Sequence, residues 1–176
     1  MAFTHHIIQN AYVVDDLDQG IRRWHALWGI GPFFVRRHLE LASIRYRGAA
    51  ASLDFSVAYV QAGPIMVELI EQHDDAPSAF RDMFARGQEG LHHVAVIPDD
   101  YQRVVDHYAK LGYPVATELR TTSGRGAAFI DTRPMLGHMM EVYIPSAGLD
   151  ALYRQVADAA ASWDRRELVI EVDPAR

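Results

Sequence analysis

The stretch GLHHVAVIPDD, from Gly90 to Asp100, decides the fold because a similar stretch occurs earlier in the chain. The earlier stretch is IIQNAYVVDDLD, from Ile7 to Asp18, and in the alignment of the two Gln9 corresponds to His93. Both alternate apolar and polar residues as a β-strand does, and both then reach a pair of aspartates. The chain therefore contains an internal repeat, and each copy offers a polar side chain at the equivalent position of its first strand.

An amphipathic helix is predicted after each of these strands. Asp16 and Asp100 are suitable N-caps, because an aspartate carboxylate accepts the free amides of the first helical turn. Segments 17–28 and 101–111 follow them, and each carries apolar residues at helical spacing and precedes a glycine.

Three more strands are predicted in each half. We expect them at 33–37, 53–61 and 65–71 in the first half and at 115–119, 127–131 and 138–144 in the second. The plan is βαβββ twice, and the fold class is α+β. Neither half buries its apolar face alone, so the two halves should pack together with pseudo-twofold symmetry.

The repeat also predicts the domain organisation. Residues 1–146 form one domain with modules at about 7–71 and 91–144, joined by a short helical linker at about 76–89. Residues 147–176 form a C-terminal helix and tail. Near its end, ELVIEV is typical of one more strand at an exposed edge.

The composition excludes several classes of protein. The 176 residues are 49% hydrophobic, which suits a packed globular core. We predict no transmembrane helix and no secretory signal, because the chain has no long apolar run and its start lacks the charged and apolar regions of a signal. The absence of cysteine excludes disulfides and thiolate chemistry and fits a cytoplasmic protein. The net charge of −6 argues against nucleic-acid binding.

The last strands of the two halves each contain a carboxylate. PIMVELIEQ and GHMMEVYIP align at Glu68 and Glu141, and each carboxylate lies among apolar residues, where its burial is costly unless something satisfies it. If the inner faces meet, four side chains converge: Gln9, Glu68, His93 and Glu141. An amide oxygen, an imidazole and two carboxylates suit a divalent metal. We predict one such ion and do not distinguish Zn, Co, Ni, Mn, Fe and Mg.

These residues also have simpler interpretations. His93 could be a hydrogen-bonded core histidine, and both glutamates could face solvent on the outer side of a sheet. His92 should point away from His93, because strand side chains alternate, and we expect a structural role for it. Met66 and Tyr143 share the ligand faces of their strands and should line the pocket, although either could be plain core.

Four motifs carry a family resemblance: YVVDDLDQGIRRW with GIGPF, MVELIE, HHVAV and MMEVY. Together they resemble the vicinal oxygen chelate superfamily, which includes glyoxalase I, methylmalonyl-CoA epimerase, extradiol dioxygenases and bleomycin-resistance proteins. The resemblance covers the chain up to about Pro145. It implies paired βαβββ modules in a cup-shaped, partly open eight-stranded barrel around a metal. GIGPFF is most similar to the epimerase branch, whereas the ligand order Gln, Glu, His, Glu is that of human-type glyoxalase I, a zinc enzyme.

The resemblance also implies an activity. It points to a metal-dependent isomerase, epimerase or lyase that acts on a carbonyl or thioester, such as a CoA or glutathione thioester, through a metal-stabilised enediolate. Glu141 matches the family's basic glutamate and is the expected base, with Glu68 as second choice. A homodimer is expected.

Two alternatives stay open. One is a small-molecule binding protein of the antibiotic-resistance type, with or without a metal. An extradiol dioxygenase is less favoured, since it needs two histidines and one carboxylate and only His93 is well placed.

The segment FFVRRHLELASIRYRG contains four arginines, Arg36, Arg37, Arg45 and Arg47. A basic cluster of this kind predicts either a solvated surface or a clamp for an anion, such as a CoA phosphate or a carboxylate of the substrate. Only one of the 17 basic residues is lysine, so we expect any bound anion to be held by arginine.

Overall fold

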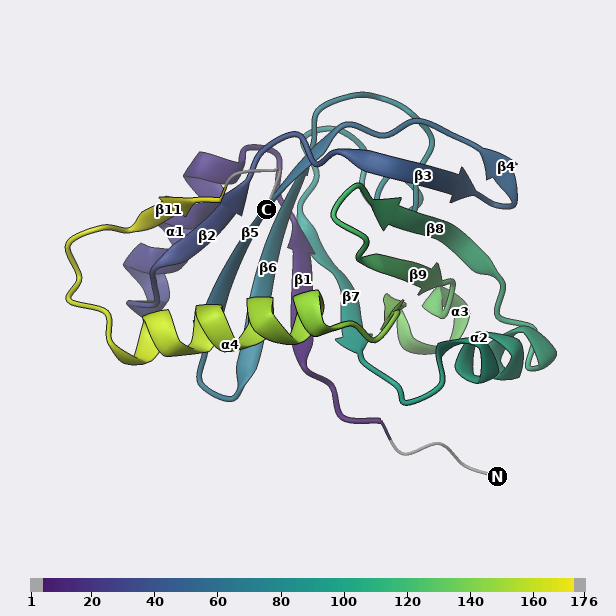
Figure 1. Cartoon of the computed structure of the whole chain (residues 1–176). Helices are drawn as coiled ribbons and strands as arrows, with labels where there is room; N and C mark the ends of the chain where they lie inside the picture. The colour runs from purple at the N-terminus through teal and green to yellow at the C-terminus, as the bar shows by residue number, and fades with distance from the viewer. Residues whose placement is uncertain (1–4, 173–176) are drawn as a thin grey trace.

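The computed structural model describes residues 5–172, in which one continuous sheet carries four helices (Figure 1). The strands are β1 (Gln9–Val13), β2 (Phe33–Arg36), β3 (Leu41–Tyr46), β4 (Ala49–Ala50), β5 (Phe55–Ala62), β6 (Ile65–Gln72), β7 (Gly90–Val96), β8 (Val115–Thr121), β9 (Gly126–Ile130), β10 (Met139–Tyr143) and β11 (Val169–Glu171). The helices are α1 (Leu17–Trp28), α2 (Tyr101–Lys110), α3 (Arg133–Leu136) and α4 (Ala147–Ala161). None of the helices among these residues has the length and apolar character needed to cross a membrane.

The order of the strands confirms the two βαβββ modules. β1 and β7 lie side by side and antiparallel at the centre of the sheet. Outward from β1 follow β6, β5 and β2, and outward from β7 follow the equivalent strands β10, β9 and β8. β6 is parallel to β1 and β10 is parallel to β7, so both halves have the same connectivity. The sheet curves around a concave face without closing, and β3, β4 and β11 extend the expected eight strands.

The strand register reproduces the sequence repeat. Gln9 lies opposite Met66 in the first half, and His93 lies opposite Met139 in the second. Glu68 and Glu141 lie two residues beyond these methionines, on the same strand faces. The expected N-caps are also present, because the carboxylates of Asp16 and Asp100 accept backbone amides three residues later.

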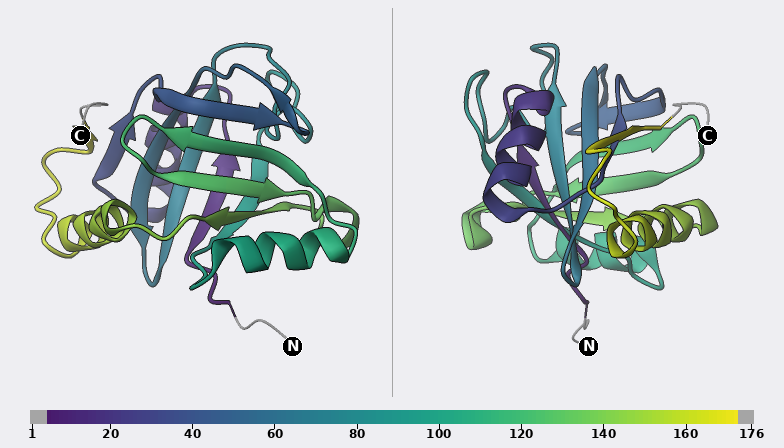
Figure 2. Two further views of the ribbon diagram at one scale, coloured as in Figure 1. Left: turned by 45° about the vertical axis from the view of Figure 1, so that its right-hand side comes forward. Right: turned by 90° about the vertical axis from the view of Figure 1, so that its left-hand side faces the viewer.

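The helices cover both faces of the sheet. α1 buries Leu17 and Ile21 on the outer face of the first module, and α2 covers the outer face of the second. α4, at the expected place in the chain, packs on the concave side through Leu152 and Val156 (Figure 2). β11 adds to the sheet beside β2, which confirms the expected edge strand.

The linker between the modules differs from the prediction. Residues 76–89 form hydrogen-bonded turns and not a helix. The amides of Asp82 and Phe84 donate to carbonyls four residues back, but a proline at 77 and a glycine with φ of 80° at 87 confine the helical geometry to about one turn. The fully buried ring of Phe80 fixes the linker against the core.

The segment between β2 and β5 contains two strands that we did not predict, β3 and β4. β3 crosses to the second module and pairs with β8, so the first half contributes a strand to the other end of the sheet. Half of the β3 side chains are exposed and none is buried, and the sequence therefore lacks the apolar alternation that would have identified a strand.

Candidate metal centre

Four polar side chains meet at the centre of the concave face, as the repeat predicts. They come from β1, β6, β7 and β10, which are neighbours in the sheet, and all four are at least 95% buried: Gln9, Glu68, His93 and Glu141. The Nε2 atom of His93 lies 3.1 Å from Glu141 Oε2 and 3.6 Å from Glu68 Oε2. The amide nitrogen of Gln9 donates to Glu68 Oε2 at 2.6 Å.

A β-bulge changes the expected position of His92. Ala11 lies opposite His93, whereas Tyr12 lies opposite Leu91, so His92 is an extra residue in the β1–β7 ladder. Its ring is fully buried, packs against the same phenylalanine as the ring of His93, and contacts His93 itself. The prediction that His92 faces away from His93 is therefore wrong, because strict alternation fails at a bulge.

The hydrogen bonds of His92 determine the tautomer of His93. The carbonyl of Ala79 can only accept, so the Nε2–H of His92 donates to it at 2.9 Å. Burial and the charge of His93 hold the pKa of His92 well below its usual value, so this ring is neutral and its Nδ1 is an acceptor. The Nδ1–H of His93 then donates to it at 2.8 Å. In neutral His93 the lone pair is therefore on Nε2, which faces the two glutamates.

The two carboxylates change the protonation behaviour of the centre. Burial alone would lower the pKa of His93, but its contacts with Glu141 and Glu68 raise that pKa to about 9. Burial, together with the charge of Glu141, raises the pKa of Glu68. His93 therefore carries a proton at neutral pH, beside the two carboxylates.

The donor set fits a divalent metal. Donor atoms of Glu68, His93 and Glu141 lie within 4.8 Å of one another. Among the described residues, His93 Nε2 and Glu141 Oε2 are buried with no hydrogen-bond partner, and such atoms are costly unless a ligand satisfies them. Gln9 directs its amide nitrogen to Glu68, so it would bind an ion through oxygen only after its side-chain amide turns over.

A tyrosine that sequence reasoning missed completes the centre. The hydroxyl of Tyr153, on α4, donates to Gln9 Oε1 at 2.5 Å, and the hydroxyl of Tyr143 reaches the same oxygen at 3.4 Å. Burial raises the pKa of both tyrosines far above its usual value, so both remain protonated donors. The repeat offered no signal for Tyr153, because α4 lies outside it.

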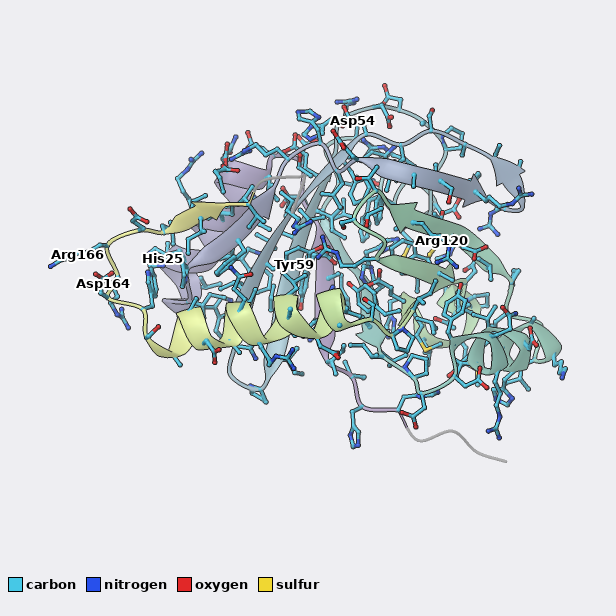
Figure 3. The ribbon with its side chains drawn as sticks, in the orientation of Figure 1. His25, Asp54, Tyr59, Arg120, Asp164 and Arg166 are labelled. Carbon is cyan, nitrogen blue, oxygen red and sulfur yellow. The ribbon has the colours of Figure 1, made fainter. Side chains whose placement is uncertain are left out.

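The pocket that opens on these residues is mainly apolar. Glu68 and Glu141 lie in its wall, and the other lining side chains include Tyr59, Phe55, Phe80, Phe129, Leu149 and Leu152. The last two come from α4, which packs beside Tyr59 of β5 (Figure 3). Tyr143 lines the pocket as expected, whereas Met66 packs in the core and does not line it.

The four arginines of the first module lie in four different environments. Arg37 forms ion pairs with Asp18 and Glu171, and Arg47 pairs with two other aspartates. Arg45 is exposed on β3 and donates to the carbonyl of Gly48. Of the two interpretations of this cluster, a single clamp formed by all four arginines is not what the structure has, because these residues belong to different strand faces and to a crossing strand.

Arg36 is the exception, and it lies close to an arginine that we did not predict. Burial and the charge of Arg125 lower the pKa of Arg36. The Nη2 atom of Arg125 is buried and has no hydrogen-bond partner among the described residues. Both arginines line a groove outside the pocket, between α4, β11 and the β8–β9 turn, and Arg125 also lines the pocket itself. The pocket therefore has a positively charged mouth.

We expect His92→Leu to lower the affinity of the centre for Zn²⁺ by about 10- to 100-fold, as loss of a partner that orients a metal ligand usually does. Leucine fills similar space but cannot accept the Nδ1–H of His93, so the ring loses its fixed tautomer. Titration of metal-free protein by calorimetry measures the effect. His138→Leu is the matched control, because among the described residues that ring hydrogen-bonds the carbonyl of Met139 and none of the four side chains of the centre. Equal affinities of the two variants would contradict the role of His92.

Comparison with known proteins agrees with this geometry. Residues 8–129 match the family model described as the Glyoxalase/Bleomycin resistance protein/Dioxygenase superfamily. No curated protein matches the sequence significantly.

Solved structures with the same fold include three structures of methylmalonyl-CoA epimerases. A complex with methylmalonyl-CoA and NH4+ has a TM-score of 0.54 at 18% identity, over 81% of this chain and 96% of that one. A variant of the Streptomyces coelicolor enzyme with 2-nitronate-propionyl-CoA has a TM-score of 0.55 at 19% identity, over 83% of this chain and 100% of that one. The enzyme from Mycobacterium tuberculosis has a TM-score of 0.53 at 20% identity, over 86% of this chain and 97% of that one.

At these identities the solved structures show a common fold and no more. The family model, in contrast, spans most of the chain, including β1, β6 and β7 with three of the four converging side chains. The chain therefore belongs to the Glyoxalase/Bleomycin resistance protein/Dioxygenase superfamily.

Proposed function

We propose that this protein is a metal-dependent enzyme that removes and returns the α-proton of a carbonyl or thioester substrate, in an epimerisation or a 1,2-proton shift. The observation that carries the proposal is the buried set of Glu68, His93 and Glu141, whose two glutamates lie in the wall of an apolar pocket. Such a set combines metal ligands with two candidate bases. A divalent ion held by it would polarise the substrate carbonyl and stabilise the negative charge that develops on its oxygen.

Glu141 is the proposed base. Apart from its 3.1 Å contact with His93 Nε2, its Oε2 atom has no hydrogen-bond partner among the described residues, whereas the same atom of Glu68 also accepts from Gln9. Glu141 is therefore the less constrained of the two carboxylates. It would accept the α-proton from the substrate carbon and return it to the same or the neighbouring carbon.

Glu68 supports delivery of the proton to the opposite face. It occupies the equivalent strand position in the other module, and both carboxylates contact the same ring nitrogen of His93. A substrate carbon between them has one carboxyl group on each side. This arrangement favours epimerisation, in which one group takes a proton and the other gives one.

The surroundings of the pocket favour a deprotonation step. Tyr59, Tyr143 and Tyr153 remain neutral because burial raises the pKa of each hydroxyl. Tyr143 and Tyr153 hold Gln9 in place, and Tyr59 holds Glu68, as donors and not as charges. The apolar lining excludes water, which strengthens the electrostatic effect of the centre on the substrate.

Arg36 and Arg125 support an anionic substrate. The two guanidinium groups repel each other, and an anion bound between them would relieve that repulsion. The outer groove continues from Arg125 along α4 and would accommodate an elongated carrier group. A CoA thioester with a second carboxylate suits both features, and CoA thioesters are bound in two of the structures with this fold.

The test is proton exchange in heavy water. We expect wild-type protein with added Zn²⁺ or Co²⁺ to exchange the α-proton of a 2-carboxyacyl-CoA, as followed by NMR, and to stop when a chelator removes the ion. An acyl-CoA of equal length without the second carboxylate serves as the matched substrate and should react more slowly. Arg125→Gln should remove that preference.

A negative result would also be informative. If metal-loaded protein exchanges no α-proton of any CoA thioester or hemithioacetal, the proposed reaction is wrong. Saturable binding of an aromatic compound in the phenylalanine-lined pocket would then favour a small-molecule binding protein.

A further inference from the structure

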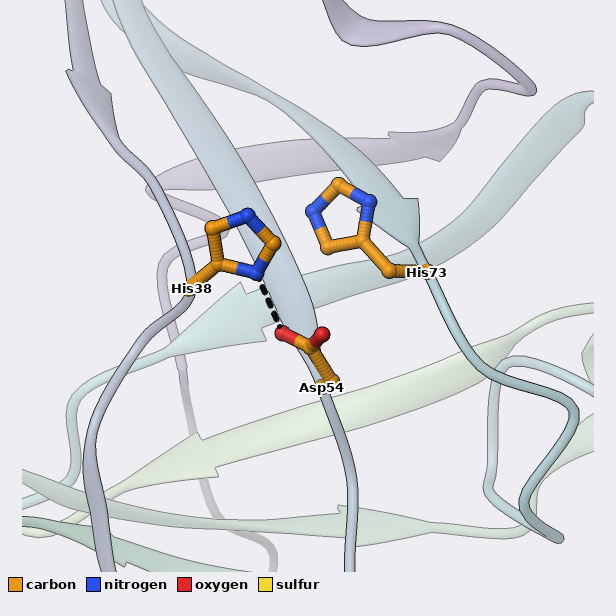
Figure 4. Close-up of side chains that lie close together, drawn as sticks. All are labelled: His38, Asp54 and His73. Carbon is orange, nitrogen blue, oxygen red and sulfur yellow. Dashed lines mark hydrogen bonds and ion pairs between the residues drawn. The ribbon is translucent and has the colours of Figure 1, made fainter.

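A second group of metal-binding side chains lies outside the pocket. His38 follows β2, Asp54 precedes β5, and His73 follows β6. These strands are neighbours in the sheet, and each contributes one residue beyond its end, on the same side of the sheet. A ring nitrogen of each histidine and a carboxylate oxygen of Asp54 lie within 4.8 Å of one another. Figure 4 shows the two rings on either side of the carboxylate, with His38 Nδ1 2.7 Å from Asp54 Oδ1.

The backbone holds these three residues in fixed relative positions. The amide of Leu39, next to His38, donates to the carbonyl of Phe55, next to Asp54, at 2.9 Å. The amide of His73 donates to the carbonyl of Asp54 at 2.8 Å. The amide of His38 donates to the hydroxyl of Ser56 at 2.9 Å. A metal site built on such strand ends needs little rearrangement when an ion binds.

The ring of His73 has the support expected of a metal ligand. Its Nδ1 lies 3.1 Å from Glu71 Oε1, and the other oxygen of Glu71 accepts the amide of Leu17. A carboxylate that receives the second N–H of a histidine fixes the ring and raises the basicity of the remaining nitrogen. That nitrogen, Nε2, accepts from the hydroxyl of Ser56 at 2.7 Å, and an ion bound to it would replace this hydrogen bond.

This group is distinct from the buried centre. The side chains of His38, Asp54 and His73 are 64%, 47% and 24% exposed, and none of them lines the pocket. In Figure 3, Asp54 lies at the edge of the molecule, well away from Tyr59 in the pocket. An ion here would be open to solvent and would keep water in its remaining positions.

We propose that His38, Asp54 and His73 form a second divalent metal site of the zinc class. Two imidazoles and one carboxylate favour Zn²⁺, Co²⁺ or Ni²⁺ over Ca²⁺ and Mg²⁺, which prefer sets of oxygen ligands. The ion fastens the segment that leaves β2 to the ends of β5 and β6. Because this segment leads into β3, which pairs with β8, the site stabilises the crossing between the two modules.

The proposal predicts two metal equivalents per chain. We would strip the full chain with a chelator and titrate it with Co²⁺, following visible absorption and, after gel filtration, metal content by mass spectrometry. Wild type should bind two ions, and His38→Ala/His73→Ala should bind one. His93→Ala should also bind one, and the variant with all three changes should bind none. His6→Ala changes an exposed histidine outside the group and should leave two equivalents.

Two further variants separate a built site from a surface ion pair. Glu71→Gln should weaken the second site by about 10- to 100-fold, since it removes the charge behind His73. Asp54→Asn removes one charged ligand with little change in shape and should weaken it further, while circular dichroism verifies folding. The second site would be overturned if His38→Ala/His73→Ala still bound two metal ions per chain. It would also be overturned if wild type bound a single ion that only His93→Ala removes. If wild type instead bound one metal ion per chain and only His38→Ala/His73→Ala removed it, the second site would be supported and the buried centre would bind no ion.

Discussion

We expect Glu141→Gln to lower the rate of α-proton exchange by about two to four orders of magnitude, the usual contribution of a general base. Glutamine has nearly the same shape and keeps an oxygen for an ion, but it cannot accept the proton. The loss should therefore appear in kcat, with little change in KM and with most of the metal retained. NMR in heavy water measures the exchange, and mass spectrometry of metals measures the ion content.

Two other glutamates provide the comparison for this variant. Glu118→Gln on β8 changes a carboxylate that contacts Tyr101 and does not line the pocket, so exchange should stay at the wild-type rate. Glu68→Gln changes the equivalent residue of the first module and should reduce exchange less than Glu141→Gln. A larger loss for Glu68→Gln would reverse the two roles, and full activity of Glu141→Gln would exclude it as the base.

The repeat made the centre of this site predictable from the sequence. Aligning Asp16 with Asp100 placed Gln9 on His93, and the register of β1 with β6 and of β7 with β10 reproduces that equivalence. The apolar residues on both sides of Glu68 and Glu141 favoured inward-facing carboxylates over the alternative that they face solvent, and both side chains are buried. These inferences succeeded because each depends on regular geometry within a strand pair.

Features that depend on irregular geometry were not predictable. The bulge that brings His92 beside His93 adds one residue to a ladder, and its sequence does not mark it. Tyr153 reaches Gln9 from a helix whose docking on the sheet has no counterpart in the repeat.

The arginines show the same limit. Arg36 and Arg37 are neighbours in the sequence, yet one lines the groove beside Arg125 and the other pairs with Asp18 on α1. Their proximity in the sequence was compatible with a shared clamp. Side-chain alternation along the strand instead places the two guanidinium groups in separate environments. Arg125 itself lies in the turn between β8 and β9, and only the packing of α4 and β11 brings that turn to the pocket mouth.

The largest loss is expected for His93→Ala, which should abolish metal binding at the buried centre and with it all metal-dependent exchange. His93 is the only nitrogen donor of the set, and its Nε2 lies between both carboxylates. Removal of the ring leaves Glu68 and Glu141 without a positive partner. Their carboxylate oxygens lie within 4.8 Å of each other, and like charges this close disfavour ionisation of both groups. The remaining carboxylates therefore attract a cation less than the number of oxygens suggests.

This experiment is cleanest in the His38→Ala/His73→Ala background, in which only the buried centre remains to be counted. Addition of His93→Ala should reduce the metal content from one equivalent to none, whereas addition of His138→Ala should leave it at one. His93→Gln supplies a neutral oxygen with less loss of volume. It therefore tests whether the cavity left by the ring, and not the lost nitrogen, causes the loss of metal binding. If His93→Gln folds as wild type does and still binds no ion, the imidazole nitrogen is the required ligand. An undiminished equivalent in His93→Ala would instead show that the ion at this centre does not depend on His93, and the alignment of Gln9 with His93 would then reflect packing alone.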